Sequence, residues 1–292
     1  MFRKQKLLYG WMAREKVVDY LMQCSKPDQE RLDGILASWS KAVDKRAVIL
    51  KNEAGLADQI SVSDLPGSFA EKLDFLQNQA VFKNSFRNQT VEFKLIEIDK
   101  LVTHTVFVYQ DYVDKLLAKL SPKPGLGELL DFCLPLTKEP EASSRLRLDQ
   151  FNYVYSSESP DFRLIDVIAK PANELDLSGI AEGVPVRAII ILMGFGFPMV
   201  KAVRVGKRLV LDNGFHRLYA LRCLGVTHVP AVVTNDAANV SKYLPLDFIA
   251  NSSRPPLFKD FFDPDLTTEV SKQKSKRAVK VSIVPEVLDV PA

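Results

Sequence analysis

Apolar side chains recur at helical spacing through the first part of the chain. Residues 14–23, 25–43 and 64–79 each repeat them every three or four positions, which predicts amphipathic helices. We therefore predict a helical N-terminal region over residues 1–88.

The second of these helices carries the clearest apolar stripe. Ser25 and Pro27 stand at its beginning, and both residue types suit a helix N-terminus. We expect the stripe to pack in the core of the same chain; the alternative is a surface that contacts a protein partner. Its members are Leu32, Ile35, Leu36, Trp39 and Val43.

The pattern changes to strict alternation near Thr90. Apolar residues at 91, 93 and 95 alternate with charged ones at 92 and 94, which predicts a strand. Residues 110–120 return to helical spacing, and Pro122 and Pro124 end that helix because proline cannot continue it.

Residues 121–184 give a weaker pattern. Two alternating runs within 145–168 flank a turn rich in serine with one proline, and they predict a β-hairpin. The apolar run at 184–196 suits a buried helix or a strand, and we favour a helix that ends at Gly194 and Gly196.

The clearest pattern lies in residues 198–233. Two apolar runs flank Gly206-Lys207, which predicts a hairpin with a tight turn. A helix then begins near Phe215 and ends at Gly225, and a short strand follows.

Composition and charge narrow the class of protein. Lys and Arg number 39 and Asp and Glu 36, so the net charge of +3 does not by itself indicate a nucleic-acid partner. A basic run near the C-terminus is either a solvated tail or loop, or a contact to DNA phosphates. It comprises Lys272, Lys274, Lys276, Arg277 and Lys280.

Scattered cysteines and histidines predict neither a disulfide framework nor a metal site. Cys24, Cys133 and Cys223 are far apart in sequence, and we expect Cys223 to be buried in the helix that contains it. The longest apolar stretch, 188–200, is too short to span a bilayer, and no signal-peptide pattern is present. We therefore expect a cytoplasmic protein with no membrane contact.

The stretch "LDNGFHRLYALRCLG" carries the candidate chemistry. Asn213 and Gly214 allow a sharp turn between a strand and a helix, and the first N–H groups of a helix form a positive end that attracts anions. His216 and Arg217 lie in the first turn, where they would donate hydrogen bonds to a phosphate. Asp212, the nearest carboxylate, either orients Arg217 or a metal–phosphate complex, or is an ordinary turn residue.

Residues 194–233 resemble the ParB/sulfiredoxin superfamily, as a divergent ParB N-terminal-like domain. The family pattern is a strand, a G-x-H-R or G-E-R-R turn, a helix with Ala and Leu-Gly, and a strand with Val-Pro. Residues 91–101 and 108–120 are similar to the family's opening strand and helix. The matching residues are Gly214, His216, Arg217, Ala220, Leu224, Gly225, Val229 and Pro230.

This resemblance implies an α+β fold, a small mixed sheet with helices over residues 89–235. Residues 121–184 would be an insertion, and 236–292 a C-terminal extension. The resemblance also implies that the turn and its helix hold the phosphates of ATP, ADP or CTP with magnesium. That role falls on Gly214, Phe215, His216 and Arg217.

Departures from the family pattern limit what the resemblance implies. Phe215 stands where sulfiredoxins carry their catalytic cysteine, and Leu218 and Tyr219 stand where ParB proteins carry a second arginine. The expected function is nucleotide binding, with phosphoryl transfer or hydrolysis left open and no catalytic residue assigned. The alternatives are a non-catalytic binding or regulatory module and a DNA-binding or nuclease-like protein.

Overall fold

The chain forms two compact units, each described here by itself. The first comprises residues 1–137 and 198–274, and the second comprises residues 138–197 and 275–292. The computed structural model describes residues 2–24, 27–87, 89–136, 143–149, 151–159, 162–176, 184–196, 198–237, 240, 245–286 and 288.

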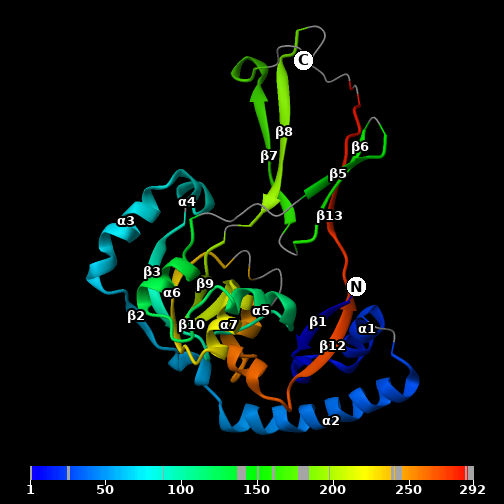
Figure 1. The fold of residues 1–292 in the computed structure, drawn as a ribbon, viewed down its shortest axis with the longest axis vertical. Coiled ribbons are helices and arrows are strands. Elements are labelled where there is room, and N and C mark those ends of the chain that lie inside the picture. The colour runs from blue at the N-terminus through cyan, green and yellow to red at the C-terminus, as the bar shows by residue number, and fades with distance from the viewer. Residues whose placement is uncertain are drawn as a thin grey trace. The chain divides into compact units, whose positions relative to one another are not determined.

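Helices and strands alternate irregularly along the chain (Figure 1), which makes this an α+β protein as the sequence predicted. The helices are α1 (Arg14–Cys24), α2 (Gln29–Asn52), α3 (Ala70–Asn78), α4 (Ala80–Ser85), α5 (Gln110–Leu117), α6 (Leu126–Cys133), α7 (Phe215–Cys223) and α8 (Leu246–Asn251). The strands are β1 (Phe2–Leu7), β2 (Val62–Asp64), β3 (Val91–Glu97), β4 (Phe107–Tyr109), β5 (Ser143–Arg147), β6 (Asn152–Ser157), β7 (Phe162–Pro171), β8 (Arg187–Phe195), β9 (Lys201–Val205), β10 (Arg208–Asn213), β11 (His228–Thr234), β12 (Thr268–Gln273) and β13 (Arg277–Ser282).

A five-stranded mixed sheet forms the centre of the first unit. Its strand order is β10-β9-β11-β3-β2, with β11 parallel to β9 and antiparallel to β3. The predicted hairpin is present as β9 and β10, and Gly206 in its turn has a φ of 61°. Helix α7 connects β10 to β11, packs against α5 and β4, and ends with Gly225 at a φ of 80°. The strongest sequence pattern therefore gave the correct elements.

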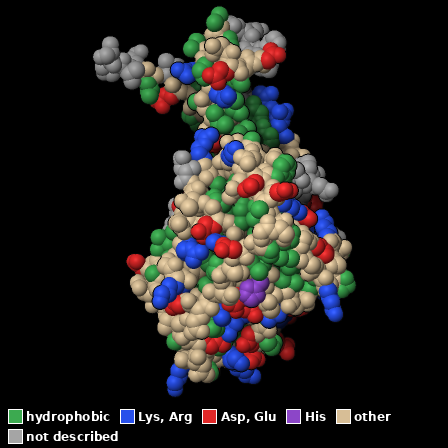
Figure 2. All heavy atoms as spheres, turned by 90° about the vertical axis from the view of Figure 1, so that its left-hand side faces the viewer, with side chains coloured by type: hydrophobic (Ala, Val, Ile, Leu, Met, Phe, Trp, Pro, Cys, Tyr) green, Lys and Arg blue, Asp and Glu red, His purple; other side chains and the backbone are tan. Residues whose placement is uncertain are grey.

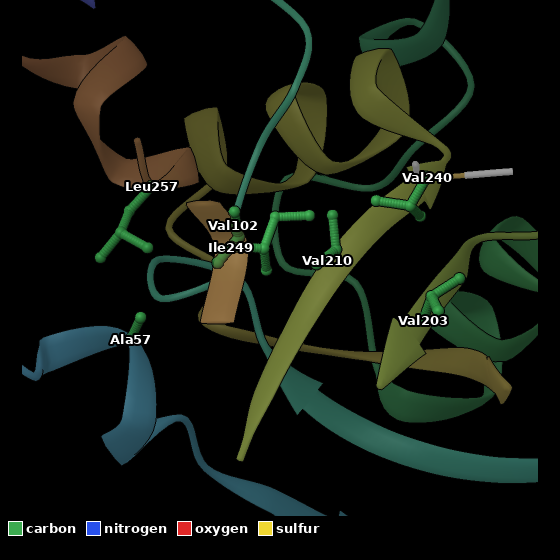
Figure 3. Packing of buried hydrophobic residues seen from close by; sticks show 7 residues of the cluster. All are labelled: Ala57, Val102, Val203, Val210, Val240, Ile249 and Leu257. Carbon is green, nitrogen blue, oxygen red and sulfur yellow. The ribbon is translucent and has the colours of Figure 1, made fainter. Parts of the chain in front are cut away.

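Valine side chains contribute much of the core of this unit, because β11 buries six of its seven residues, β10 four of its six, and β9 buries Ala202 and Val203. Val102 connects the sheet to the segment that follows α8, since it forms β-bridges with both Val210 and Leu257. Figure 3 shows seven members of this cluster: Ala57, Val102, Val203, Val210, Val240, Ile249 and Leu257.

A second sheet in the first unit joins distant parts of the sequence. Its strand order is β12-β1-β4, and Phe2 of β1 pairs with Gln273 of β12. The basic run expected to be a tail or loop is therefore divided: its first part lies in β12 and its last part in β13 of the second unit. Lys272 lies over the ring of Tyr20, 5.6 Å from its centroid, so this lysine packs within the unit.

The N-terminal region is mainly helical, with β1 and β2 as additional strands. Helix α2 begins after Asp28, whose carboxylate accepts a hydrogen bond from the Arg31 N–H at 2.9 Å. Ser25, predicted near this start, lies outside the described residues. The predicted stripe is half-buried, whereas the fully buried side of α2 is made by Ala42 and Ile49.

A buried ion-pair network holds the C-terminal part of the first unit to α2. Arg254 is fully buried and pairs with Asp260 at 2.5 Å and with Glu53 at 2.9 Å. Because a buried charge is costly unless it is paired, this network fixes the segment that follows α8. Of the helices within the described ranges, none is long and apolar enough to cross a membrane.

The second unit corrects two sequence predictions. Strand β6 pairs with β5 and β13, and β7 pairs with β8, so the two runs predicted to form a hairpin with each other have other partners. The run at 184–196, favoured as a helix, forms strand β8. Its consecutive isoleucines, Ile189, Ile190 and Ile191, explain the difference, because β-branched side chains suit an extended backbone better than a helix.

Candidate functional site

The turn between β10 and α7 requires glycine. Gly214 has a φ of 104°, in the left-handed region, and it occupies the N-cap position of α7. A Cβ atom at this position would lie 2.9 Å from Cγ2 of Val200, closer than such atoms approach in proteins. The neighbouring Asn213 fixes the turn from the other side, because its Nδ2 donates to the Met199 carbonyl at 2.8 Å.

The N-terminus of α7 has neither a side-chain cap nor a compensating negative charge. The N-cap residue, Gly214, makes no side-chain hydrogen bond that caps the helix, and the first turn contains no acidic residue. The first intrahelical bond is from the Leu218 N–H to the Gly214 carbonyl at 3.0 Å. The N–H groups before Leu218 therefore form a positive helix end that can accept an anion.

His216 has a packing role at this helix end. Its ring stacks on Tyr109 with centroids 5.5 Å apart and meets Tyr112 edge-on at 5.2 Å. Its Nε2 atom accepts a hydrogen bond from the backbone N–H of Tyr109 at 3.0 Å. Burial lowers the pKa of His216 to about 4, so the ring is neutral at pH 7 with its proton on Nδ1. The ring therefore joins α7 to β4 and α5.

Phe215, the first residue of α7, contacts a second histidine. Its ring meets His104 edge-on, with centroids 5.0 Å apart. Burial lowers the pKa of His104, and the charge of Asp212 opposes that shift. Both rings therefore lie beside the turn that begins α7.

Arg217 brings a fixed positive charge to the first turn. Its Nη1 donates a hydrogen bond to the carbonyl of Pro198, in the segment that leads into β9. Its guanidinium also lies over the ring of Phe132 in α6, 5.7 Å from the centroid. These two contacts hold the guanidinium next to the turn. The four predicted site residues, Gly214, Phe215, His216 and Arg217, therefore lie together at the start of α7.

Asp212 pairs with a lysine that sequence reasoning missed. Its Oδ2 lies 3.1 Å from Nζ of Lys201, and both side chains are largely buried, at 14% and 12% exposure. The ion pair of Asp212 is with Lys201, and the alternative that Asp212 orients Arg217 stays a prediction. The only sequence feature that could have indicated Lys201 is its position at the beginning of strand β9, and that feature is weak.

Tyr109 and Val200 were also missed by sequence reasoning. Tyr109 holds His216, and Val200 excludes any residue larger than glycine at 214. A short sequence motif does not include these contacts. Tyr109 is 107 positions away from His216, and Val200 precedes the motif that contains Gly214.

The three cysteines differ in exposure. Cys24 and Cys133 are buried, and burial raises the pKa of the Cys133 thiol to about 12. Cys223, expected to be buried, is exposed because it lies past the buried stretch of α7 that ends at Leu221. Among the described residues, no three His, Cys, Asp or Glu side chains form a group that could hold a metal ion.

Comparisons with known proteins assign no family to this chain. No protein-family model matches it. No curated protein matches it, and no solved structure matches it. The resemblance to the ParB/sulfiredoxin superfamily therefore stays a prediction from the sequence motif.

Proposed function

We propose that the protein binds the phosphates of a nucleotide at the β10–α7 turn. The observation that carries this proposal is the uncapped N-terminus of α7, which has Arg217 in its first turn and no acidic residue there. A cation in the first turn of a helix is unfavourable by roughly 0.3–1 kcal/mol, and a bound anion reverses the sign of that interaction.

Each residue of the turn has a separate part in this proposal. Gly214 allows the phosphate to approach the backbone, and the N–H groups of Phe215, His216 and Arg217 donate to it. The guanidinium of Arg217, which donates to the Pro198 carbonyl beside the turn, adds a charge-assisted bond to the phosphate. His216 acts here through its backbone and through the ring contacts that hold the helix end, since its Nε2 accepts from Tyr109.

The nucleotide is ATP, ADP or CTP, with magnesium bound through the phosphates. We assign no catalytic residue, because the carboxylate nearest the turn, Asp212, forms an ion pair with Lys201. The proposed function is therefore nucleotide binding that changes the state of the protein, and phosphoryl transfer or hydrolysis is an outcome for experiment. No observation favours DNA as the ligand, since the basic run is divided between β12 and β13.

Calorimetric titration of the full chain with ATP, ADP and CTP, each with magnesium, tests the proposal. We expect one of them to bind, and we expect Arg217→Ala to weaken its affinity by roughly tenfold to a hundredfold, the value of a lost charged hydrogen bond. Arg204→Ala is the matched control, because Arg204 is a half-exposed arginine of β9 paired with Glu92.

Two results separate the possible outcomes. If no nucleotide binds, or if Arg217→Ala and Arg204→Ala have equal effects, the proposed site is wrong. If a nucleotide binds and phosphate is released over time, the protein is an enzyme, and Asp212→Asn tests whether the nearest carboxylate takes part.

A further inference from the structure

Strands β7 and β8 form a long hairpin whose apolar side chains face solvent. They pair antiparallel from Phe162 with Phe195 to Pro171 with Arg187. Ile189 is 72% exposed, and Val167, which pairs with Ile191, is 53% exposed. Figure 2 shows hydrophobic side chains gathered in the part of the surface that the hairpin forms. An isolated two-stranded hairpin is at best marginally stable in water, so a further strand along its edge would stabilise this one.

The two edges of the hairpin differ in how they are protected. Strand β7 carries Asp166 and Lys170, ends at a proline, and has an irregularity between Leu164 and Asp166. Charges, prolines and bulges are the features by which natural edge strands avoid further pairing. Strand β7 also contacts β13 of the same unit.

Strand β8 lacks these features along the edge that faces away from β7. It pairs with β7 alone among the residues that the structure describes. Its sequence, RAIIILMGF, has one charge, Arg187 at the first position, and no proline. The outer edge of β8 therefore presents eight uncharged residues in an extended conformation, which is a template for another strand.

We propose that this edge pairs with β8 of a second copy of the chain, as an antiparallel interface around a two-fold axis at Ile191. Ile191 is the midpoint of the nine residues of β8, so this register pairs the whole strand with itself. It places Ile189 opposite Met193 and Ile190 opposite Leu192 of the other copy. Each hairpin then becomes half of a four-stranded sheet.

A second copy suits this edge better than a strand of another composition. In the proposed register Arg187 lies opposite Phe195, so no two like charges face each other, and an arginine beside an aromatic ring is favourable. Every pair from 189 to 193 joins two apolar side chains, at least one of them isoleucine, and cross-strand pairs of this kind stabilise neighbouring strands. A charged peptide would find no opposite charge along residues 188–195. A closed two-fold interface also uses the same patch on both subunits, which this strand supplies.

Light scattering of the full chain during size-exclusion chromatography, over a range of protein concentrations, tests the proposal. We expect a concentration-dependent dimer. Ile191→Lys places two lysines opposite each other at the axis and should raise the dissociation constant at least about tenfold.

Val167→Lys is the matched control because Val167 lies directly opposite Ile191 on β7, on the same face. In the dimer the two Val167 positions are three strand spacings apart, about 14 Å, beyond the Debye length of about 8 Å. A chain that stays monomeric at all concentrations, or equal effects of the two lysines, would overturn the proposal.

Disulfide trapping provides a second readout that does not depend on affinity. In a Cys223→Ser background, Ile191→Cys should give a crosslinked dimer on copper-phenanthroline oxidation, because opposed residues of antiparallel strands lie about 4.5–5.5 Å apart. Val167→Cys should remain uncrosslinked. Crosslinking of both variants to the same extent, or of neither, would contradict the proposed register.

Discussion

Replacing Gly214 by alanine tests the geometry of the turn that begins α7. The φ of 104° is unfavourable for an L-residue by roughly 1–2 kcal/mol. The new Cβ would also lie 2.9 Å from Cγ2 and 3.2 Å from Cα of Val200, which is fully buried. Overpacking of this kind costs about 1–3 kcal/mol. Alanine stiffens the unfolded chain and returns about 0.4–1 kcal/mol, so we expect a net loss of about 1–4.5 kcal/mol.

Gly225→Ala is the control that separates the two contributions. Gly225 has a similar φ of 80°, but nothing lies within 4 Å of the position that its Cβ would take. We therefore expect Gly225→Ala to cost about 1 kcal/mol, from the backbone alone.

Urea unfolding followed by tryptophan fluorescence measures both variants. Trp11 and Trp39 both lie in the first unit, with the two glycines, so the signal reports on the unit that contains the turn. If Gly214→Ala costs no more than Gly225→Ala, the close approach of Val200 does not constrain the turn and the reasoning fails.

Two further predictions concern buried polar groups of the first unit. The pKa of His216 is about 4 in the folded protein and near 6.5 in the unfolded chain. The free energy of unfolding therefore contains the full contribution of the neutral ring above pH 6.5. That contribution is lost as the pH falls toward 4, by up to about 3 kcal/mol. His216→Gln should flatten the dependence of urea-unfolding stability on pH in that window, and an unchanged slope would show that another group titrates. Arg254→Met should cost about 3–5 kcal/mol at pH 7, because it leaves the Asp260 carboxylate buried without its cation; a near-zero cost in the same assay would mean that Asp260 takes up a proton readily.

Local patterns were sufficient to predict the elements around the candidate site. Alternating residues before and after Gly206, and helical spacing from Phe215 to Gly225, correspond to β9, β10 and α7. In these segments turn chemistry and hydrophobic period favour the same structure, so the sequence has one consistent solution.

Prediction from the sequence was insufficient for strands whose pairing partners are distant in sequence. It was also insufficient where the same residues suit both a helix and a strand. Nothing near Phe2 indicates that β1 pairs with β12, because that pairing joins the two ends of the first unit. The run from Ile189 to Ile191 suits a buried helix by its length and a strand by its branching, and only its pairing with β7 decides.

In the candidate site, too, contacts between residues that are distant in sequence could not be predicted. The motif identified Gly214 and Arg217 as neighbours at a helix start, which the structure bears out. It also suggested that His216 donates to a phosphate; the ring nitrogen Nε2 accepts from Tyr109, and donation to a phosphate stays a prediction. A sequence motif gives the residue type and its place in the turn, but the packing that lowers the pKa of His216 comes from β4 and α5.

The most direct test of the account is the response of the backbone amides at the start of α7 to a nucleotide. Protein labelled with nitrogen-15 at glycine, phenylalanine, histidine and arginine gives amide signals for residues 214–217, assigned by single substitutions. Titration with ADP and magnesium, and in parallel with ATP and CTP, should shift these four signals together for at least one nucleotide, with little change at Gly206 or Gly225. Shifts confined to other regions, or no shifts with any of the three, would contradict the proposal that phosphates bind at this helix end.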